Sequence, residues 1–234
     1  MWAGILQRKG TRREMNRRQS IPLVFNRVAE RWWEWRLGIH STGDYTSNQL
    51  ELRNDGIPYD PIPFRAFFRA MEHVPKELLQ GSFVDYGAGK GRALVLAARY
   101  YPFRQVLGVE MSSELCRHAE GNLQRAGAKN ATVVCCDAAN YVPPTDTTVF
   151  FMYNPFFGET MRKVLHNLRK SLQENPRVTA IVVCRARNFL AATLGQNWFQ
   201  ELACGTMLSE FNWHVFLTLT DRSRKHEHES GFGL

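Results

Sequence analysis

Residues 83–92 read FVDYGAGKGR, and these ten residues set the architecture of the chain. The apolar start with Asp85 is typical of a buried strand, and glycines follow at alternate positions, Gly87, Gly89 and Gly91. A stretch with helix-like composition begins at once. Glycine admits positive φ and lets a ligand approach the backbone, and the start of a helix offers unpaired N–H groups. We therefore predict a strand that turns sharply into a helix around a bound ligand.

Strand and helix patterns alternate from here to the end of the chain. We predict strands at 83–86, 105–110, 132–136, 147–153 and 178–184, and helices at 90–101, 113–126, 158–173 and 188–201. Residues 206–220 have apolar side chains at alternate positions and suit one or two antiparallel strands at the sheet edge. Such alternation implies right-handed crossovers and a parallel sheet covered on both faces. We expect an α/β, doubly wound, mostly parallel sheet with an antiparallel C-terminal edge strand.

Polar residues follow three further strands. In sheets of this kind ligands bind beyond the carboxyl ends of the strands. Glu110, 21 residues past Gly89, suits the two hydroxyls of a ribose, and Asp137 suits the amino group of an adenine. Asn154, followed by proline, would face the reactive end of a cofactor. A helix cap or a solvated turn explains each residue singly, but together they indicate one crevice.

The glycine spacing selects among nucleotide folds. It departs from the GxGxxG of dinucleotide enzymes, which disfavours a nicotinamide-dependent oxidoreductase, and it lacks the Walker A pattern. Asp85 with Gly87, Gly89 and Gly91 resembles the first motif of the class I S-adenosylmethionine-dependent methyltransferases. The stretches LGIHSTG, VDYGAGKGR, LGVEMSSEL and YNPF extend the resemblance over about residues 35–185, to a bacterial-type group of unassigned substrate. It implies a Rossmann-like seven-stranded sheet and S-adenosylmethionine as cofactor.

The same resemblance implies roles for individual residues. It assigns cofactor contacts to Asp85, Gly87, Ala88, Gly89, Glu110, Met111, Asp137, Ala138 and Asn154. It places the methyl acceptor beside Asn154, Pro155 and Phe156, with Tyr59 covering the site from the N-terminal side. Lys90 and Arg92 are interpreted as surface charges at a helix start.

The expected reaction is methyl transfer to a nitrogen or oxygen nucleophile. Asn154-Pro155-Phe156 suits an amine, so a protein lysine or other amine is favoured over a small molecule. The usual [DN]PP[YF] motif has a second proline that this chain lacks, which weakens the case for methylation of a nucleic-acid adenine. The alternative is a nucleic-acid-binding protein whose methyltransferase fold is catalytically idle.

Charge and composition suggest four regions. We expect a basic disordered arm at 1–20, a helical extension or lid at 21–80, a cofactor-binding domain at 81–221 and a polar tail at 222–234. The net charge is +8, and five of these charges lie in residues 1–18, which hold six basic side chains and one acid. Basic residues 8–18 would make any weak contact with nucleic acid or another anionic partner. The helix predicted at 21–37 holds Trp32, Trp33 and Trp35, whose role as lid, core or partner surface stays open.

The five cysteines form no CxxC pair, which indicates reduced thiols and predicts no metal site. His214, in a predicted strand, is interpreted as structural, and His226 and His228 belong to the polar tail. No apolar run approaches the roughly 20 residues of a membrane span, and the N-terminus has no signal-peptide core. We expect a cytoplasmic protein.

Overall fold

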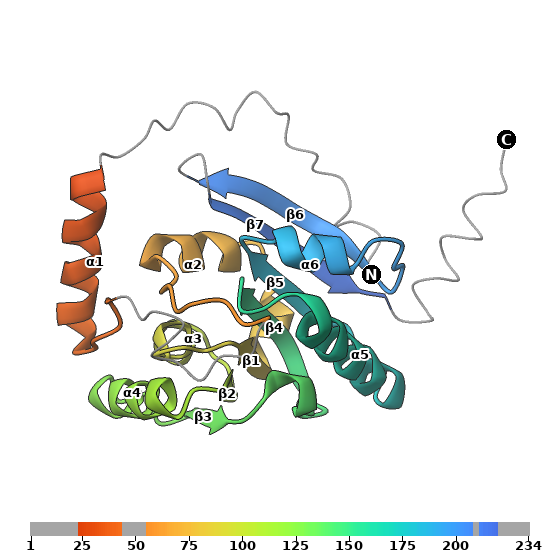
Figure 1. The fold of residues 1–234 in the computed structure, drawn as a ribbon, viewed down its shortest axis with the longest axis horizontal. Coiled ribbons are helices and arrows are strands. Elements are labelled where there is room, and N and C mark those ends of the chain that lie inside the picture. The colour runs from red at the N-terminus through yellow and green to blue at the C-terminus, as the bar shows by residue number, and fades with distance from the viewer. Residues whose placement is uncertain (1–22, 44–54, 208–210, 220–234) are drawn as a thin grey trace, which may run out of the picture.

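The computed structural model describes residues 23–43, 55–207 and 211–219. The predicted arm at 1–20 and tail at 222–234 lie outside these residues. Seven strands form one sheet in the order β3-β2-β1-β4-β5-β7-β6 (Figure 1). They are β1 Ser82–Tyr86, β2 Gln105–Glu110, β3 Ala131–Cys135, β4 Thr147–Tyr153, β5 Ala180–Cys184, β6 Phe199–Met207 and β7 Phe211–Thr218. Strands β1 to β5 are parallel, β7 pairs antiparallel with β5, and β6 pairs antiparallel with β7, so the predicted fold class is confirmed.

Helices cover both faces of the sheet. They are α1 Leu23–Leu37, α2 Phe64–Met71, α3 Arg92–Tyr100, α4 Ser113–Arg125, α5 Gly158–Glu174 and α6 Arg187–Ala192, with the 3₁₀ turns η2 Lys76–Gln80 and η3 Ala138–Asn140. Figure 1 shows α1 to α4 on one side of the sheet and α5 and α6 on the other. The central strand β4 is apolar and buried from Val149 to Met152 because both of its faces are covered. Phe150 and Phe151 are consecutive residues of β4 and point to opposite faces of the sheet, so they belong to two separate hydrophobic cores.

The helix predicted at 188–201 is wrong in its second half. Helix α6 ends at Ala192, a turn with Gly195 at φ +76° follows, and residues 199–201 begin β6. Phe199 packs against Phe216 of β7 and Phe189 of α6, with ring centroids 5.3 and 5.9 Å apart. Pairing with β7 thus makes residues 199–201 part of a strand, although their local sequence pattern predicts a helix. The strands and helices predicted between residues 83 and 184 lie within about two residues of the observed ones. Of the one or two strands predicted at 206–220, β7 lies inside that range, whereas β6 begins earlier, at Phe199.

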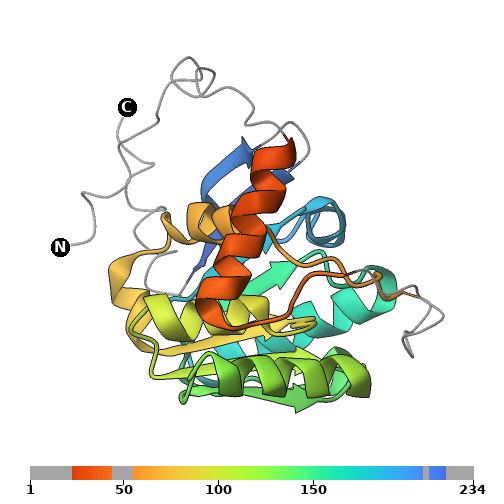
Figure 2. The same cartoon turned by 90° about the vertical axis from the view of Figure 1, so that its left-hand side faces the viewer.

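Helix α1 is the outermost element on its side of the molecule, as Figure 2 shows. Its three tryptophans have different environments. Trp33 stacks on Phe64 of α2, whereas Trp32 and Trp35 are 48% and 79% exposed. Trp33 therefore anchors the helix, and the other two face solvent. None of the helices in the described ranges has the length and apolarity to cross a bilayer. All five cysteines are free thiols.

Candidate functional site

A cavity opens at the carboxyl ends of the parallel strands, where β1 and β4 lie side by side and the order of the strands reverses. Its empty volume is about 1040 Å³, a figure that includes open solvent at the mouth. Residues 55–62 form one wall and the ends of β1, β2, β4 and β5 form the others. The lining includes all twelve residues that the sequence analysis assigned to a site: Tyr59, Asp85, Gly87, Ala88, Gly89, Glu110, Met111, Asp137, Ala138, Asn154, Pro155 and Phe156.

The glycine turn is packed against protein on two sides. Gly87 and Gly89 have φ of +78° and +56°. A Cβ atom on Gly87 would lie 2.3 Å from Cβ of Pro155, and one on Gly89 would lie 2.4 Å from the ring of Tyr59. The absent side chains thus let the wall residues Pro155 and Tyr59 close onto the turn.

Gly89→Ala is expected to weaken binding of the cofactor that the sequence resemblance implies at least tenfold, because the added methyl displaces Tyr59 from the cavity wall. The measurement is calorimetric titration with S-adenosylhomocysteine. Gly195→Ala is the matched control: Gly195 also has a left-handed φ, +76°, but no atom lies within 4 Å of its Cβ position. Both variants pay backbone strain of about 1–2 kcal/mol, and only the first meets a neighbour. Equal affinities in the two variants would contradict the packing role.

Glu110, at the end of β2, is held by three backbone donors. Its Oε2 accepts from the N–H of Gly89 at 2.9 Å, and its Oε1 accepts from Met111 and Ser112 at 2.9 and 3.0 Å. Burial raises the pKa of this carboxyl, and the three N–H groups oppose the rise. A carboxylate offers about four acceptor positions, so capacity is left for a hydroxyl group.

Asp85, at the end of β1, is the most unusual carboxyl in the cavity. It is 3% exposed, and no described residue donates a hydrogen bond to its side chain. Burial, and then the neighbouring Glu110, raise its pKa to about 8. A buried carboxyl without a partner is costly unless a cation or donor meets it. Asp85 therefore suits a positively charged ligand group.

Asp137 and Met111 line the far part of the cavity, beyond β3 and β2. The Oδ1 of Asp137 caps the short turn η3 by accepting from the N–H of Ala139 at 2.9 Å. The same turn carries the buried Ala138. Capping fixes the backbone that follows β3, so that Asp137 and Ala138 present a defined edge to a planar ligand.

The opposite part of the cavity is formed by the exits of β4 and β5. Asn154 has φ +44°, and its Oδ1 accepts from Nδ2 of Asn188 at 2.9 Å. Asp60 accepts from the hydroxyl of Tyr153 at 3.0 Å and from Arg185 at 2.5 Å. The sequence analysis missed Asn188, Asp60 and Arg185. Arg185 directly follows β5, so the rule that found Glu110 also applies to it, whereas no sequence signal marked the other two.

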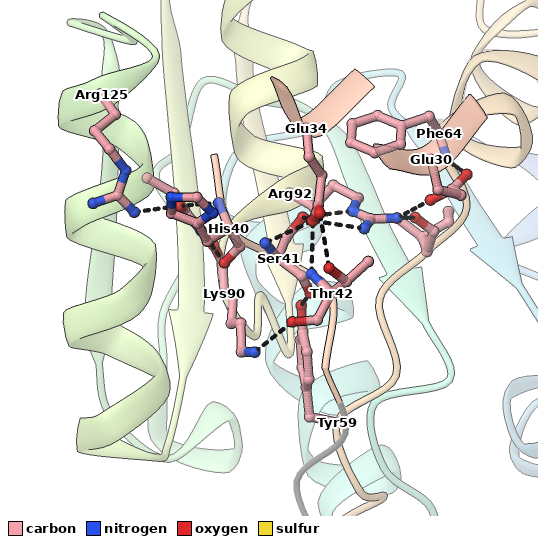
Figure 3. Close-up of polar contacts among 12 residues, drawn as sticks. Glu30, Glu34, His40, Ser41, Thr42, Tyr59, Phe64, Lys90, Arg92 and Arg125 are labelled. Carbon is pink, nitrogen blue, oxygen red and sulfur yellow. Dashed lines mark hydrogen bonds and ion pairs between the residues drawn. The ribbon is translucent and has the colours of Figure 1, made fainter. Parts of the chain in front are cut away.

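The interpretation of Lys90 and Arg92 as surface charges is wrong. Both are buried, at 5% and 3% exposure. The guanidinium of Arg92 donates to Glu30 at 2.5 Å, to the carbonyl of Ile62 at 2.7 Å and to Glu34 at 3.3 Å (Figure 3). It therefore ties α1 and the segment before α2 to the first residue of α3.

The same cluster reaches Tyr59. Glu34 accepts from Ser41 and Thr42, and the hydroxyl of Tyr59 donates to the carbonyl of Ser41 at 2.6 Å (Figure 3). Lys90 donates to the carbonyl of Thr42 at 3.0 Å, and its ammonium lies 5.1 Å from the ring centre of Tyr59. Arg92 and its partners thus connect the N-terminal segment to the cavity wall.

Residues 83–175 match the family model described as a methyltransferase domain. Residues 83–175 therefore form a methyltransferase domain of the class I S-adenosylmethionine-dependent type. A protein-lysine N-methyltransferase of Saccharolobus islandicus is 25% identical to this methyltransferase over 124 residues, which are 53% of this chain and 75% of the relative. A tRNA (guanine-N(7)-)-methyltransferase of Yersinia enterocolitica is 30% identical over 124 residues, 50% of this chain and 47% of the relative. This methyltransferase therefore spans about half of the second relative.

The fold is also found in solved structures. A putative methyltransferase of Escherichia coli, yhhF, superposes with a TM-score of 0.54 at 17% identity, over 74% of this chain and 92% of that one. The tRNA methyltransferase TrmK of Bacillus subtilis superposes with a TM-score of 0.54 at 10% identity, over 73% and 70%. These likenesses concern the fold, and the relatives differ in what they methylate.

The cavity of this methyltransferase fits S-adenosylmethionine, the cofactor of the family. The unpartnered carboxyl of Asp85 suits a charged amino group, and Glu110, fixed by three N–H groups, has acceptor capacity for a ribose. Asp137 and Met111 line the region that remains for an adenine. When bound, the cofactor supplies an electrophilic methyl group on a sulfonium.

Proposed function

We propose that this methyltransferase methylates an amine, with a protein lysine as the favoured acceptor. Asn154 carries the proposal. It stands on the cavity wall with Oδ1 oriented by Asn188, and a carbonyl oxygen with one donor can accept a second. An amine nucleophile becomes cationic as it attacks, so an acceptor for its N–H groups stabilises the developing charge.

The surroundings of Asn154 suit a cation. The aromatic rings of Tyr153 and Phe156 line the same part of the cavity, and aromatic faces attract cations. Asp55 and Asp60 add carboxylates to the wall, and Arg185 is the basic residue that accompanies Asp60. The similarity to a protein-lysine N-methyltransferase supports the same choice.

The individual roles are part of the proposal. Cofactor contacts are assigned to Asp85, Gly87, Ala88, Gly89, Glu110, Met111, Asp137, Ala138 and Asn154. The acceptor side is assigned to Asn154, Pro155, Phe156 and Tyr59. Within the predicted lid, residues 55–62 act as the covering segment, because they line the cavity and Tyr59 lies against the glycine turn. Much of the rate enhancement then comes from alignment of the acceptor in the cavity.

Transfer of a tritiated methyl group to fractionated cell extract tests this function. We expect label in protein, recovered as methyllysine after hydrolysis. Asn154→Ala should lower kcat at least tenfold and weaken S-adenosylhomocysteine binding by a smaller factor, because the removed amide acts on the acceptor as well as on the cofactor. Asn175→Ala, at an exposed position, is the control. Label in small molecules alone, or an unchanged kcat in Asn154→Ala, would refute the lysine proposal.

A nucleic-acid-binding role is the second candidate, and helix α1 favours it. Trp32 and Trp35 are exposed beside Arg31 and Arg36, and the guanidinium of Arg36 lies 5.4 Å from the ring centre of Trp32. Exposed aromatic rings among basic side chains suit stacked bases and phosphates. Salt-sensitive RNA binding lost in Trp32→Ala/Trp35→Ala, without methyl transfer to any fraction, would support this role over the first.

A further inference from the structure

Three metal-binding side chains meet on the β6–β7 hairpin, away from the cavity. They are Glu201 and Cys204 of β6 and His214 of β7, and one ligand atom of each lies within 4.8 Å of the other two. Nδ1 of His214 is 2.6 Å from Oε1 of Glu201. In the part of the chain that the structure describes, this is the group of three that meets the distance limit for a shared ion.

Strand pairing explains how the three converge. Cys204 is paired with His214, so their side chains leave the same face of the hairpin. Glu201 lies three residues before Cys204, and regular alternation would send it to the opposite face. The pairing shifts by one residue between Glu201 and Ala203, and this bulge returns Glu201 to the face of Cys204 and His214.

The histidine is held by its neighbours, and the other two residues are open to water. His214 is parallel to the ring of Phe216, with centroids 5.9 Å apart and planes 6° apart. Its side chain is 16% exposed, that of Glu201 is 44% exposed, and Cys204 is also exposed. A partly buried imidazole with two accessible partners gives an ion an entry path and leaves room for water as a fourth ligand.

The donor set suits zinc. Imidazole nitrogen, thiolate sulfur and carboxylate oxygen are the protein ligands of Zn²⁺, at about 2.0–2.3 Å in tetrahedral geometry. Such geometry spaces ligand atoms by roughly 3–4 Å, so the contact between Glu201 and His214 opens by about 1 Å to admit the ion. Burial and the Glu201 carboxylate raise the pKa of the Cys204 thiol. A divalent cation between these groups favours the thiolate over the thiol, so that binding of the ion releases the thiol proton.

We propose that Glu201, Cys204 and His214 form a binding site for Zn²⁺, with water as the fourth ligand. The sequence analysis predicted no metal site, because the three residues have no familiar spacing and meet through a bulge. Asn212 lies two residues before His214, and its backbone carbonyl accepts a hydrogen bond from the backbone N–H of Arg185 at 2.8 Å. The site therefore anchors the hairpin beside a strand exit that lines the cavity, and its role is structural.

Cobalt substitution of the untagged full-length protein tests the proposal without any methyl-transfer assay. Co²⁺ is titrated into the metal-free protein under reducing conditions, and Zn²⁺ is then used to compete. We expect one ion per chain, a near-ultraviolet thiolate-to-cobalt band, and displacement by one equivalent of Zn²⁺. Cys204→Ser should abolish the band, and His214→Gln should weaken Zn²⁺ binding at least tenfold.

Matched variants exclude other thiols and imidazoles. Cys135→Ser and His166→Gln change exposed residues elsewhere and should leave affinity and spectrum unchanged. His226→Gln/His228→Gln removes the histidines of the C-terminal tail and should also have no effect. Stoichiometric binding without a thiolate band would overturn the proposal. Loss of binding in the tail variant, or equal binding in Cys204→Ser, His214→Gln and the parent, would overturn it as well.

Discussion

Arg92→Met is expected to lower Tm by about 10 °C and to weaken cofactor binding. The substitution leaves the partly buried carboxylates of Glu30 and Glu34 without their cation. Removing one partner of a buried ion pair costs about 3–5 kcal/mol, and each kcal/mol shifts Tm by about 2–4 °C in a chain of this size. The segment that carries Tyr59 also loses its anchor, since Arg92 donates to the carbonyl of Ile62. Thermal denaturation and S-adenosylhomocysteine titration measure the two effects.

The electrostatic cause can be isolated with further variants. Burial raises the pKa of Glu30, and Arg92 opposes the rise. Glu30→Gln added to Arg92→Met should therefore recover part of the lost stability, because one unpaired charge disappears. Burial acts in the same direction on Glu34, but hydrogen bonds from Thr42 and Ser41 outweigh it and lower its pKa. Arg99→Met, at an exposed position of the same helix, is the control. If it destabilises the protein as much as Arg92→Met does, the ion cluster is not the cause.

Asp85→Asn is expected to raise the stability of the ligand-free protein while weakening cofactor binding 10- to 100-fold. The pKa of Asp85 is about 8 in the fold against 3.8 for the ordinary group. At pH 7 the folded state holds this carboxyl protonated while the unfolded chain ionises it, which costs the fold on the order of 4 kcal/mol. The amide of asparagine does not ionise and avoids that cost. Its own buried polar atoms destabilise the fold by about 1–3 kcal/mol, so the net gain in stability is smaller. The ligand, in turn, loses a charged partner for its amino group.

The pH dependence of stability and of cofactor affinity tests this role of Asp85. Between pH 4 and pH 8 the folded state keeps the Asp85 proton and the unfolded state does not, so this group's contribution to stability falls as pH rises. The variant should lack this decline. Cofactor affinity of the parent should rise with pH toward 8, because binding of a cation requires the ionised carboxyl. Denaturant unfolding and calorimetry between pH 5 and pH 8 measure both trends. A variant that loses stability and affinity together would show that Asp85 is only a packing residue.

The parallel part of the sheet was accessible from local pattern alone. The strands at 83–86, 105–110 and 147–153 are short apolar runs that end in a polar residue or a glycine. Buried parallel strands need such runs on both faces, so the run itself identifies the strand. Edge elements follow no such rule. Residues 199–201 have a helical pattern and became β6 because Phe199 packs on Phe216 across the hairpin.

Site residues divide in the same way. Asp85, Glu110 and Asp137 end consecutive parallel strands, and parallel strands bring their carboxyl ends to one edge whatever the rest of the chain does. Asn188 lies 34 residues from Asn154 and Asp60 lies 125 from Arg185, and packing alone unites each pair. The two residues of each pair have no fixed separation in the sequence, so no sequence motif can identify them.

By itself, then, the sequence determined the parallel α/β sheet and which residues at the strand ends line the cavity, because both follow from patterns within about ten residues and from the geometry of parallel strands. The tertiary structure decided the rest. Arg92 has the sequence context of a surface charge, and it is buried because α1 brings Glu30 and Glu34 onto it. Glu201, Cys204 and His214 became neighbours through one bulge in an antiparallel pair. Burial of a charge and convergence of ligands depend on contacts between distant segments, which local pattern does not record.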